Sequence, residues 1–175
     1  GESHQSKINK IQNILKLKKA DYLFISSPEN VAWLMNIRGY DNPNSPIPNC
    51  RLLVGKNKEL FLIAEEKISL NFNKEKKFKK NQIINPKNFQ SLIEKLNGEK
   101  FIIDQLSCSI LNQNIIKSKF KILEEIDPCY QLKAIKNKIE IRNTINAHIE
   151  DGLALTRFIY WIKNVNKKKI NEIDA

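Results

Sequence analysis

The sequence predicts an α/β fold: a mixed, largely parallel sheet flanked by helices and followed by a long C-terminal helix. The short continuous apolar run at 22–26 is typical of a strand that is covered on both faces, and 100–104 and 120–126 are predicted to be further strands. Stretches with apolar residues three or four positions apart lie between these runs and indicate helices. Because helices and short strands alternate along the chain, a largely parallel sheet with helices on its faces is the expected architecture.

The first helix is expected over residues 6–19. Ile8, Ile11 and Leu15 recur at three- and four-residue spacing and give this stretch one apolar face. Ser6 is the expected N-cap, because a serine hydroxyl at that position can accept a hydrogen bond from a backbone N–H of the first turn.

The second helix is expected to begin at Ser27-Pro28-Glu29. Ser27 is predicted to be the N-cap, and Pro28 suits the first helical position, where no backbone N–H is needed. Apolar residues follow between 31 and 35, and the helix is expected to end before Gly39, which would allow a sharp exit.

The rest of the sheet is expected to follow from a hairpin and three further strands. The apolar segments 52–55 and 59–64 flank a polar turn and predict a β-hairpin. The remaining predicted elements are a short helix at 65–72, a weak strand at 83–85, a helix at 86–96, a strand at 100–104, a helix at 109–117 and a strand at 120–126.

A long helix is predicted to start at Asn137. Asn137 and Glu140 have the spacing of a capping box, in which each residue satisfies a backbone N–H near the other. Apolar residues then continue on one face from Ile141 to Ile162, and this stripe needs a partner surface.

The chain is interpreted as one domain followed by the start of another. Its character changes at Asp127-Pro128, so residues 1–127 are assigned to the first domain and 128–136 to a linker. Residues 137–175 are interpreted as the start of a second domain that is cut short.

Composition argues against several classes of function. The formal net charge of +11 could attract nucleic acid, but 26 of the 30 basic residues are lysine, whereas nucleic-acid sites favour clustered arginine and stacking aromatics. The dense basic run at 74–80 is interpreted as a solvated loop. No apolar run approaches the roughly 20 residues that span a bilayer, so no membrane contact is expected.

Cysteine usage and the N-terminus favour a cytoplasmic protein. The three cysteines, Cys50, Cys108 and Cys129, are odd in number and far apart, which argues against a disulfide framework. The N-terminal residues are polar and contain no apolar core of a signal peptide.

The chain lacks the residue patterns of an assembled active site. His4 and His148 are its two histidines, and no CxxC, HExxH, GxSxG or glycine-rich phosphate motif is present. We therefore assign no catalytic residue and no metal ligand within this sequence. His148 is expected to pack or hydrogen-bond at a helix interface, and Trp33 is expected in the core.

The stretch NIRGYDNPNSPIPNC, residues 36–50, is the one candidate for a functional loop. It lies between two apolar segments and holds three of the six prolines, which stiffen a loop. It is either a long turn or a segment that presents Arg38 and Asp41. An arginine can bind a carboxylate through two parallel hydrogen bonds, and Asp41 itself, another acid or a peptide group could accept them.

Two segments resemble one protein family. Residues 20–55 contain a helix ending in an AWL-N-RG-D pattern, then a proline-containing loop and a strand. The matching positions are Val31, Ala32, Trp33, Leu34, Asn36, Arg38, Gly39, Asp41 and Pro46. Residues 132–162 carry LKAIKN followed by AHIEDG. The first segment resembles the creatinase/prolidase N-terminal domain of three-domain Xaa-Pro aminopeptidases (aminopeptidase P, peptidase family M24), and the second resembles the start of their pita-bread catalytic domain.

The resemblance implies a non-catalytic second domain of a metallo-aminopeptidase that removes the N-terminal residue from peptides with proline at the second position. It implies two divalent metal ions, Mn²⁺, held by a catalytic domain that would follow Ala175, and none in this chain. The implied partners are the rest of the same polypeptide, a second copy in a homodimer and the peptide substrate. Arg38 and Asp41 would belong to a loop of the substrate cleft. The alternatives are a stand-alone protein-binding module without peptidase activity and, less favoured by composition, a nucleic-acid binder.

Overall fold

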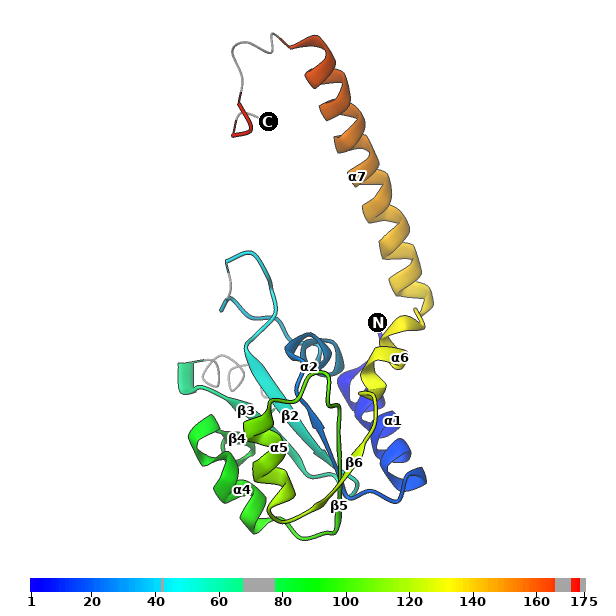
Figure 1. Cartoon of the computed structure of the whole chain (residues 1–175). Coiled ribbons are helices and arrows are strands. Elements are labelled where there is room, and N and C mark those ends of the chain that lie inside the picture. The colour runs from blue at the N-terminus through cyan, green and yellow to red at the C-terminus, as the bar shows by residue number, and fades with distance from the viewer. Residues whose placement is uncertain (42, 68–77, 166–170, 174–175) are drawn as a thin grey trace. The chain divides into compact units, whose positions relative to one another are not determined.

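Short apolar runs become the strands of a mixed sheet, as the sequence predicts (Figure 1). Within the described residues the strand order is β4-β3-β2-β1-β5-β6. The strands are β1 (Tyr22–Ile25), β2 (Cys50–Gly55), β3 (Leu60–Ala64), β4 (Ile83–Ile84), β5 (Lys100–Ile103) and β6 (Lys121–Glu124). β1 pairs with β5, β3 with β4 and β5 with β6 in parallel, whereas β2 pairs with β1 and β3 antiparallel.

The computed structural model describes residues 1–41, 43–67, 78–165 and 171–173. Most of the short helix expected at 65–72 and most of the basic run at 74–80 therefore lie outside the described residues. In the parts that are described, no helix combines the length and the apolar character that crossing a membrane requires.

The chain divides into two compact units, Glu2–Ile135 and Lys136–Ala175. The helices of the first unit are α1 (His4–Leu17), α2 (Pro28–Met35), α4 (Phe89–Lys95), α5 (Ile110–Lys117) and α6 (Pro128–Ala134), with short 3₁₀ turns at Lys80–Gln82 and Pro86–Asn88. The second unit contains α7 (Lys138–Asn164).

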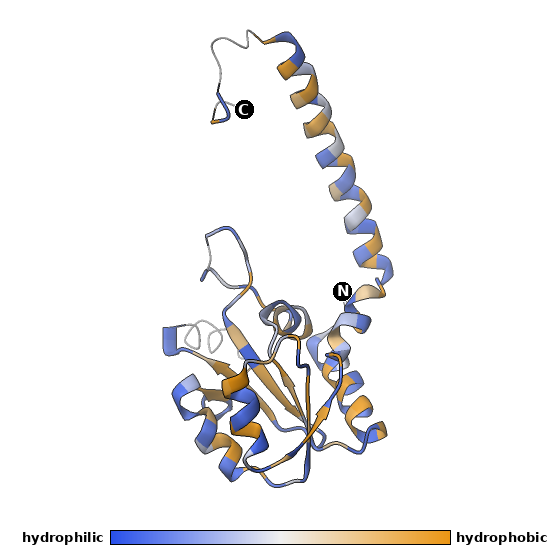
Figure 2. Ribbon diagram, viewed as in Figure 1, coloured by the Kyte–Doolittle hydropathy of each residue, from blue (hydrophilic) through white to orange (hydrophobic). Residues whose placement is uncertain are grey.

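The sheet of the first unit is covered on both faces, which explains why all four residues of β1 are apolar and buried. Side chains from α1 and α2 pack on one face, and those from α4 and α5 pack on the other (Figure 1). Leu23 and Ile25 of β1 point to the first face, and Tyr22 and Phe24 to the second, and all four are buried. Figure 2 shows the resulting concentration of hydrophobic residues along the strands.

The start of α1 differs from the prediction. The N-cap is Ser3, whose hydroxyl accepts a hydrogen bond from the Ser6 backbone N–H at 3.2 Å. Ser6 was the expected cap, but it lies inside the first turn, where its own hydroxyl donates to the Glu2 carboxylate at 2.6 Å. The helix therefore starts at His4, because Ser3 has the extended backbone that a cap requires.

The second helix begins at the predicted residues, but the Ser27 side chain does not cap it and Gly39 does not end it. Pro28 occupies the first turn and Ser27 is the N-cap residue, yet the Ser27 side chain caps no backbone N–H. Its hydroxyl instead hydrogen-bonds the Tyr130 hydroxyl at 2.8 Å. The residue that turns the chain out of α2 is Asn36, in the left-handed conformation with φ of 52°, and not Gly39.

The predicted hairpin, the weak strand and the later elements are present with small shifts. β2 and β3 pair antiparallel with Leu52 opposite Leu62. The stretch expected as one helix at 86–96 is a 3₁₀ turn followed by α4, and α5 starts after Ser109, whose hydroxyl caps the Asn112 N–H.

The segment 128–136, interpreted from the sequence as a linker, contains α6. Its Cys129 is fully buried in the core of the first unit, beside α1 and α2 residues of the same cluster. Asp127 caps this helix, because its carboxylate accepts the Cys129 N–H at 2.9 Å.

The predicted capping box at the start of α7 is confirmed. The Asn137 side chain accepts the Ile139 and Glu140 backbone N–H groups, and the Glu140 carboxylate accepts the Asn137 N–H at 2.8 Å. The helix is 27 residues long, and its apolar stripe is exposed. The exposed apolar side chains of α7 include Ile141, Ile145, Ile149, Leu153, Leu155, Phe158 and Ile159.

Candidate functional site

The candidate site is the loop between α2 and β2, residues 36–50. It starts from a fixed point, because Ile37 is fully buried and its N–H donates to the Ala32 carbonyl at 3.1 Å. It ends at Cys50, whose N–H donates to the Pro48 carbonyl at 2.9 Å. Both ends of the loop are thus held by the packed unit.

Gly39 brings the first part of the loop close to its last part, which contains Pro46 and Pro48. Its N–H donates to the Pro46 carbonyl at 2.9 Å. A Cβ at this position would lie 2.6 Å from both Cα and Cβ of Pro48, which is closer than carbon atoms can approach. Glycine is therefore required at position 39, because Pro48 leaves no room for a side chain there.

Asp41 holds the last part of the loop through a second hydrogen bond. Its carboxylate oxygen Oδ2 accepts the Asn49 backbone N–H at 2.6 Å. A hydrogen bond to an ionised carboxylate is stronger than one between neutral groups. Asp41 thus accepts from the backbone of the loop and is not the acceptor of Arg38.

Arg38 is exposed and does not pair with Asp41. Its Nη1 donates to the neighbouring Ile37 carbonyl at 2.9 Å. Among the ion pairs formed by the described residues, none involves Arg38. A guanidinium has five N–H donors in a planar fork, so most of its binding capacity faces away from this contact.

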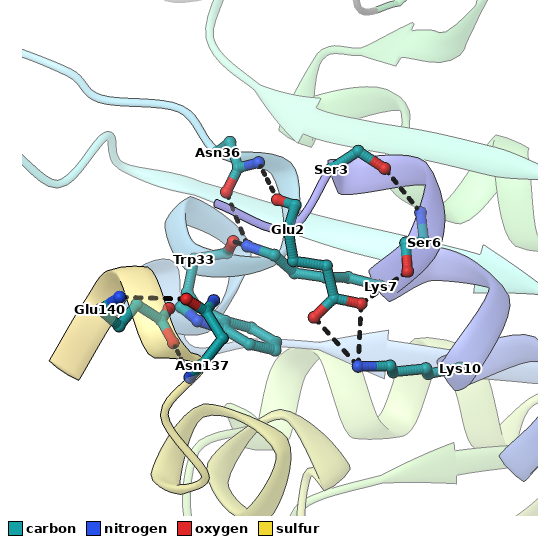
Figure 3. Close-up of polar contacts among 9 residues, drawn as sticks. All are labelled: Glu2, Ser3, Ser6, Lys7, Lys10, Trp33, Asn36, Asn137 and Glu140. Carbon is teal, nitrogen blue, oxygen red and sulfur yellow. Dashed lines mark hydrogen bonds and ion pairs between the residues drawn. The ribbon is translucent and has the colours of Figure 1, made fainter. Parts of the chain in front are cut away.

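A buried lysine anchors the helix end from which the loop leaves (Figure 3). Lys7 of α1 is 3% exposed, and its ammonium donates to the Trp33 carbonyl and, at 2.6 Å, to Oδ1 of Asn36. The ammonium also lies 4.3 Å from the centre of the Trp33 ring, within the range of a cation–π contact. A cation at the C-terminal end of a helix complements the helix dipole.

The N-terminal residues complete this anchor (Figure 3). The Asn36 side-chain amide donates to the Glu2 carbonyl at 2.9 Å. The Glu2 carboxylate accepts from Lys10 and from the Ser6 hydroxyl, and these two hydrogen bonds lower the pKa of Glu2. The sequence did not point to Lys7, because lysine at a core position is rare unless it is paired.

A second buried polar group lies where β5 ends and α6 begins. The Asn30 amide donates to Oδ2 of Asp127 at 2.7 Å, and Lys133 donates to Oδ1 of Asn30 at 2.7 Å. The Asp127 N–H donates in turn to the Asp104 carboxylate at 3.0 Å. Burial raises the pKa of Asp127, although hydrogen bonds from Cys129 and Asn30 act in the opposite direction.

The sequence does not predict this buried group, because Asp127-Pro128 there marks the boundary between the first domain and a linker. The available signal was the dipeptide itself. Aspartate is a favoured N-cap and proline a favoured first helical residue, so Asp127-Pro128 predicts a helix start as well as it predicts a linker.

The described residues contain no assembled chemical centre. No three histidine, cysteine or carboxylate side chains in the described ranges gather where they could hold a metal ion. His148 is exposed on α7, while Trp33 packs half-buried against the core. Within its described residues the loop presents the exposed guanidinium of Arg38 as a group that could bind a ligand.

The fold and the loop define a class of protein. Residues 1–140 match the creatinase/prolidase N-terminal domain family, and the chain belongs to that family. The N-terminal domain of a cytoplasmic peptidase PepQ from Mycobacterium tuberculosis has the same fold, with a TM-score of 0.55 and 13% identity over 73% of this chain and 98% of that one.

Within this family, the similar curated proteins are Xaa-Pro aminopeptidases, and the chain corresponds to a domain of such proteins. Xaa-Pro aminopeptidase 1 of Dictyostelium discoideum is 32% identical over 98% of this chain. Xaa-Pro aminopeptidase ApepP of Drosophila melanogaster is 32% identical over 90%. The chain spans only 27% and 26% of the lengths of these two relatives.

The structure of X-prolyl aminopeptidase from Caenorhabditis elegans is also similar. It matches 93% of this chain with a TM-score of 0.73 and 23% identity, while the chain covers 28% of it. That protein is described as a cytosolic enzyme with a di-nuclear active site. At this identity the likeness establishes the fold.

Proposed function

We propose that this chain is the non-catalytic domain of a metal-dependent Xaa-Pro aminopeptidase, which removes the N-terminal residue from peptides with proline at the second position. The observation that carries the proposal is the 32% identity to the Dictyostelium Xaa-Pro aminopeptidase over 98% of the chain. Since the chain spans 27% of that relative, the reaction belongs to a longer polypeptide of which this is a part.

In this proposal residues 1–127 form the second domain of three, and 137–175 begin the pita-bread catalytic domain. Residues 128–136 lead from one to the other, with α6 packed on the first unit through Cys129. The exposed apolar stripe of α7 supports this division. A stripe of that length is stable in water when it is covered, and the remainder of a catalytic domain would cover it.

The catalytic domain would hold two divalent metal ions, with Mn²⁺ as the proposed metal, and would act in the cytoplasm as a homodimer. The di-nuclear site and the cytosolic location described for the Caenorhabditis elegans enzyme support the two metal ions and the cytoplasmic location. The choice of Mn²⁺ and the homodimer rest on the family resemblance alone. The described residues do not fit a metal site, so no chemical step is assigned to them.

The role proposed for the loop 36–50 is to form part of the substrate cleft. Arg38 would donate hydrogen bonds to a peptide carbonyl or to an acid of the catalytic domain. Its guanidinium is exposed, and it donates one hydrogen bond to the Ile37 carbonyl, which leaves further N–H groups to donate. Asp41 would keep the loop in shape through Asn49.

The test compares this chain with the protein encoded by the longer reading frame. The purified chain with added Mn²⁺ should not hydrolyse an Ala-Pro-containing peptide, whereas the longer protein should. Turnover by the chain alone would overturn the assignment as a non-catalytic domain. A longer protein without two aspartates, one histidine and two glutamates after Ala175 would favour the protein-binding module instead.

A further inference from the structure

The sheet has a topological switch point where β1 and β5 end. The two strands are parallel neighbours, but the helices that follow them lie on opposite faces of the sheet, α2 after β1 and α5 after β5 (Figure 1). In open α/β sheets, ligands commonly bind outside the carboxyl ends of the strands at such a point. The polar side chains at this end of β1 and on its neighbour β2 are therefore candidates for a binding site.

Ser26, the residue after β1, carries a buried hydroxyl without a partner. The residue is 6% exposed, and within the described ranges its hydroxyl makes no hydrogen bond. Leaving a buried hydroxyl unpaired is costly, so such a group in a native protein indicates a bound water, ion or ligand.

Arg51 of β2 lies directly across from Ser26. β1 and β2 pair antiparallel with Ile25 opposite Leu52, and one further step in this register sets Ser26 opposite Arg51. Residues directly opposite each other share a face of the sheet, with Cβ atoms roughly 4.5–5.5 Å apart. On the other side of Arg51, Ile63 of β3 is its opposite residue and packs in the core under α4 and α5. Ser26 and Arg51 are therefore neighbours on that face.

Both groups also lie near the thiol of Cys108, in the segment between β5 and α5. Burial raises the pKa of this thiol, whereas the Ser26 hydroxyl and the positive charge of Arg51 act in the opposite direction. Cys108 is 8% exposed and belongs to the same apolar cluster as Ile63. The hydroxyl and the guanidinium thus meet at the edge of a packed apolar region.

The guanidinium of Arg51 has no counter-ion among the residues that the structure describes. The side chain is half-buried, and it forms neither an ion pair nor a hydrogen bond with them. Asp104, whose charge also reaches Cys108, does not supply one, because its two oxygens accept the backbone N–H groups of Leu106 at 2.9 Å and Asp127 at 3.0 Å. A cation partly withdrawn from water is stabilised when an anion pairs with it.

We propose that Ser26 and Arg51 form a binding site for a single carboxylate group. Its two oxygens would accept parallel N–H groups of the Arg51 guanidinium, and one of them would also accept the Ser26 hydroxyl. The one positive charge of Arg51 matches a monoanion, whereas a dianion such as phosphate would keep unneutralised charge beside Asp104 and apolar side chains. The carboxylate belongs to a free organic acid or to an acidic side chain of the longer polypeptide. The site is independent of the peptidase reaction proposed above, so the two can fail separately.

The test is a titration of the chain with sodium acetate at constant ionic strength, followed through the ¹⁵N signals of the arginine Nε–H groups. The chain has four arginines, at positions 38, 51, 142 and 157, and Arg51→Met identifies the signal of Arg51. Acetate should shift that signal along a saturating curve. Arg142, exposed on α7, is the internal control, and its signal should stay in place. Inorganic phosphate should bind Arg51 more weakly than acetate.

Ser26→Ala should weaken acetate binding by about 10-fold, because one hydrogen bond to a charged group is lost. Ser118→Ala, at an exposed position, is the matched control and should leave the affinity unchanged. Circular dichroism of each variant establishes that it is folded. An Arg51 signal that acetate does not move, an affinity that Ser26→Ala leaves unchanged, or tighter binding of phosphate than of acetate would overturn the proposed site.

The same titration of the longer protein separates the two sources of the carboxylate. If Arg51 responds to acetate as it does in the chain, the ligand is a free organic acid. If its signal already lies at the acetate-bound position before any acetate is added, an acidic side chain of the polypeptide occupies the site. A signal at the unbound position that acetate does not move would contradict a carboxylate site in the longer protein.

Discussion

The ammonium of Lys7 lies 4.3 Å from the centre of the Trp33 indole ring and donates a hydrogen bond to the carbonyl of the same residue. One buried side chain of α1 thus holds both the ring and the backbone at the end of α2. Because residues 36–50 start from this helix end, the position of the candidate loop depends on a residue far from it in the sequence.

Lys7→Met should destabilise the first unit. Methionine keeps the apolar stem but leaves the Trp33 carbonyl and the Asn36 amide oxygen without this donor, which costs about 1–3 kcal/mol. A thermal melt should show a clear fall in Tm. Lys16→Met, at an exposed position of the same helix, is the control and should stay within about 0.5 kcal/mol. Equal melting of both variants would show that the Lys7 contacts contribute no net stability.

Gly39→Ala should weaken the loop and the unit that carries it. The added methyl would overlap Pro48, so one arm of the loop must move at a cost of about 1–3 kcal/mol. Gly152→Ala is the matched control, since nothing lies within 4 Å of its Cβ position in α7 and alanine favours a helix. Urea unfolding should separate the two: a loss for Gly39→Ala, and no loss or a gain for Gly152→Ala. A neutral Gly39→Ala would contradict the contact with Pro48.

Arg38→Ala and Asp41→Ala should have different effects in the longer enzyme. Arg38 is exposed, and among the described residues its side chain bonds the adjacent Ile37 carbonyl, so its loss should leave Tm unchanged. If its guanidinium binds substrate, kcat/KM should fall by roughly 10- to 100-fold, the value of a hydrogen bond from a charged group. Asp41→Ala removes the acceptor of the Asn49 N–H and should lower Tm.

Arg38→Lys serves as the control for charge, because it keeps the cation and loses the planar fork. Activity of Arg38→Ala equal to that of the unchanged enzyme would rule out the cleft role. A fall in Tm for Arg38→Ala, with kcat/KM per folded molecule unchanged, would make the residue structural.

Acid should destabilise the first unit in part through Asp21. Burial favours the neutral carboxyl, but hydrogen bonds from Lys56 at 2.6 Å and from the backbone of Lys100 and Glu99 outweigh it and lower the pKa of Asp21 to about 2. A carboxyl with a lowered folded-state pKa contributes stability above its unfolded-state pKa, near 4, and loses it as pH falls toward 2.

The comparison is urea unfolding of the unchanged chain and of Asp21→Asn between pH 7 and pH 2. Asp21→Asn should be less stable at pH 7 and should lose less stability between pH 4 and pH 2. Asp151→Asn, at an exposed position of α7, is the control. Parallel stability curves for the unchanged chain and Asp21→Asn would show that Asp21 does not carry this acid sensitivity.

Much of the fold could be predicted because it depends on local patterns. The apolar run of β1 and the capping spacing of Asn137 and Glu140 are decided within a few residues. The cap of α1 was misplaced because Ser3 and Ser6 are equally suitable by type. Which of them caps depends on where the chain becomes extended, and Ser3 does.

The candidate loop was predictable in position but not in its contacts. Its prolines and glycine mark a stiff connection, whereas the partner of Asp41 is the Asn49 backbone and the neighbour of Gly39 is Pro48. Contacts between the first and last residues of a loop depend on the path of its backbone. Residue type alone does not determine that path. The burial of Lys7 depends likewise on the packing of α1 against α2.

Cys129 makes the attachment of α6 measurable without any engineered label. Its thiol is fully buried, and burial raises its pKa, so it reacts with an alkylating reagent only when α6 leaves the core. The rate at which Cys129 is alkylated in native buffer therefore reports how often α6, the last helix of the first unit, opens locally. Comparing this rate in the chain and in the longer protein would show whether later domains restrain that helix.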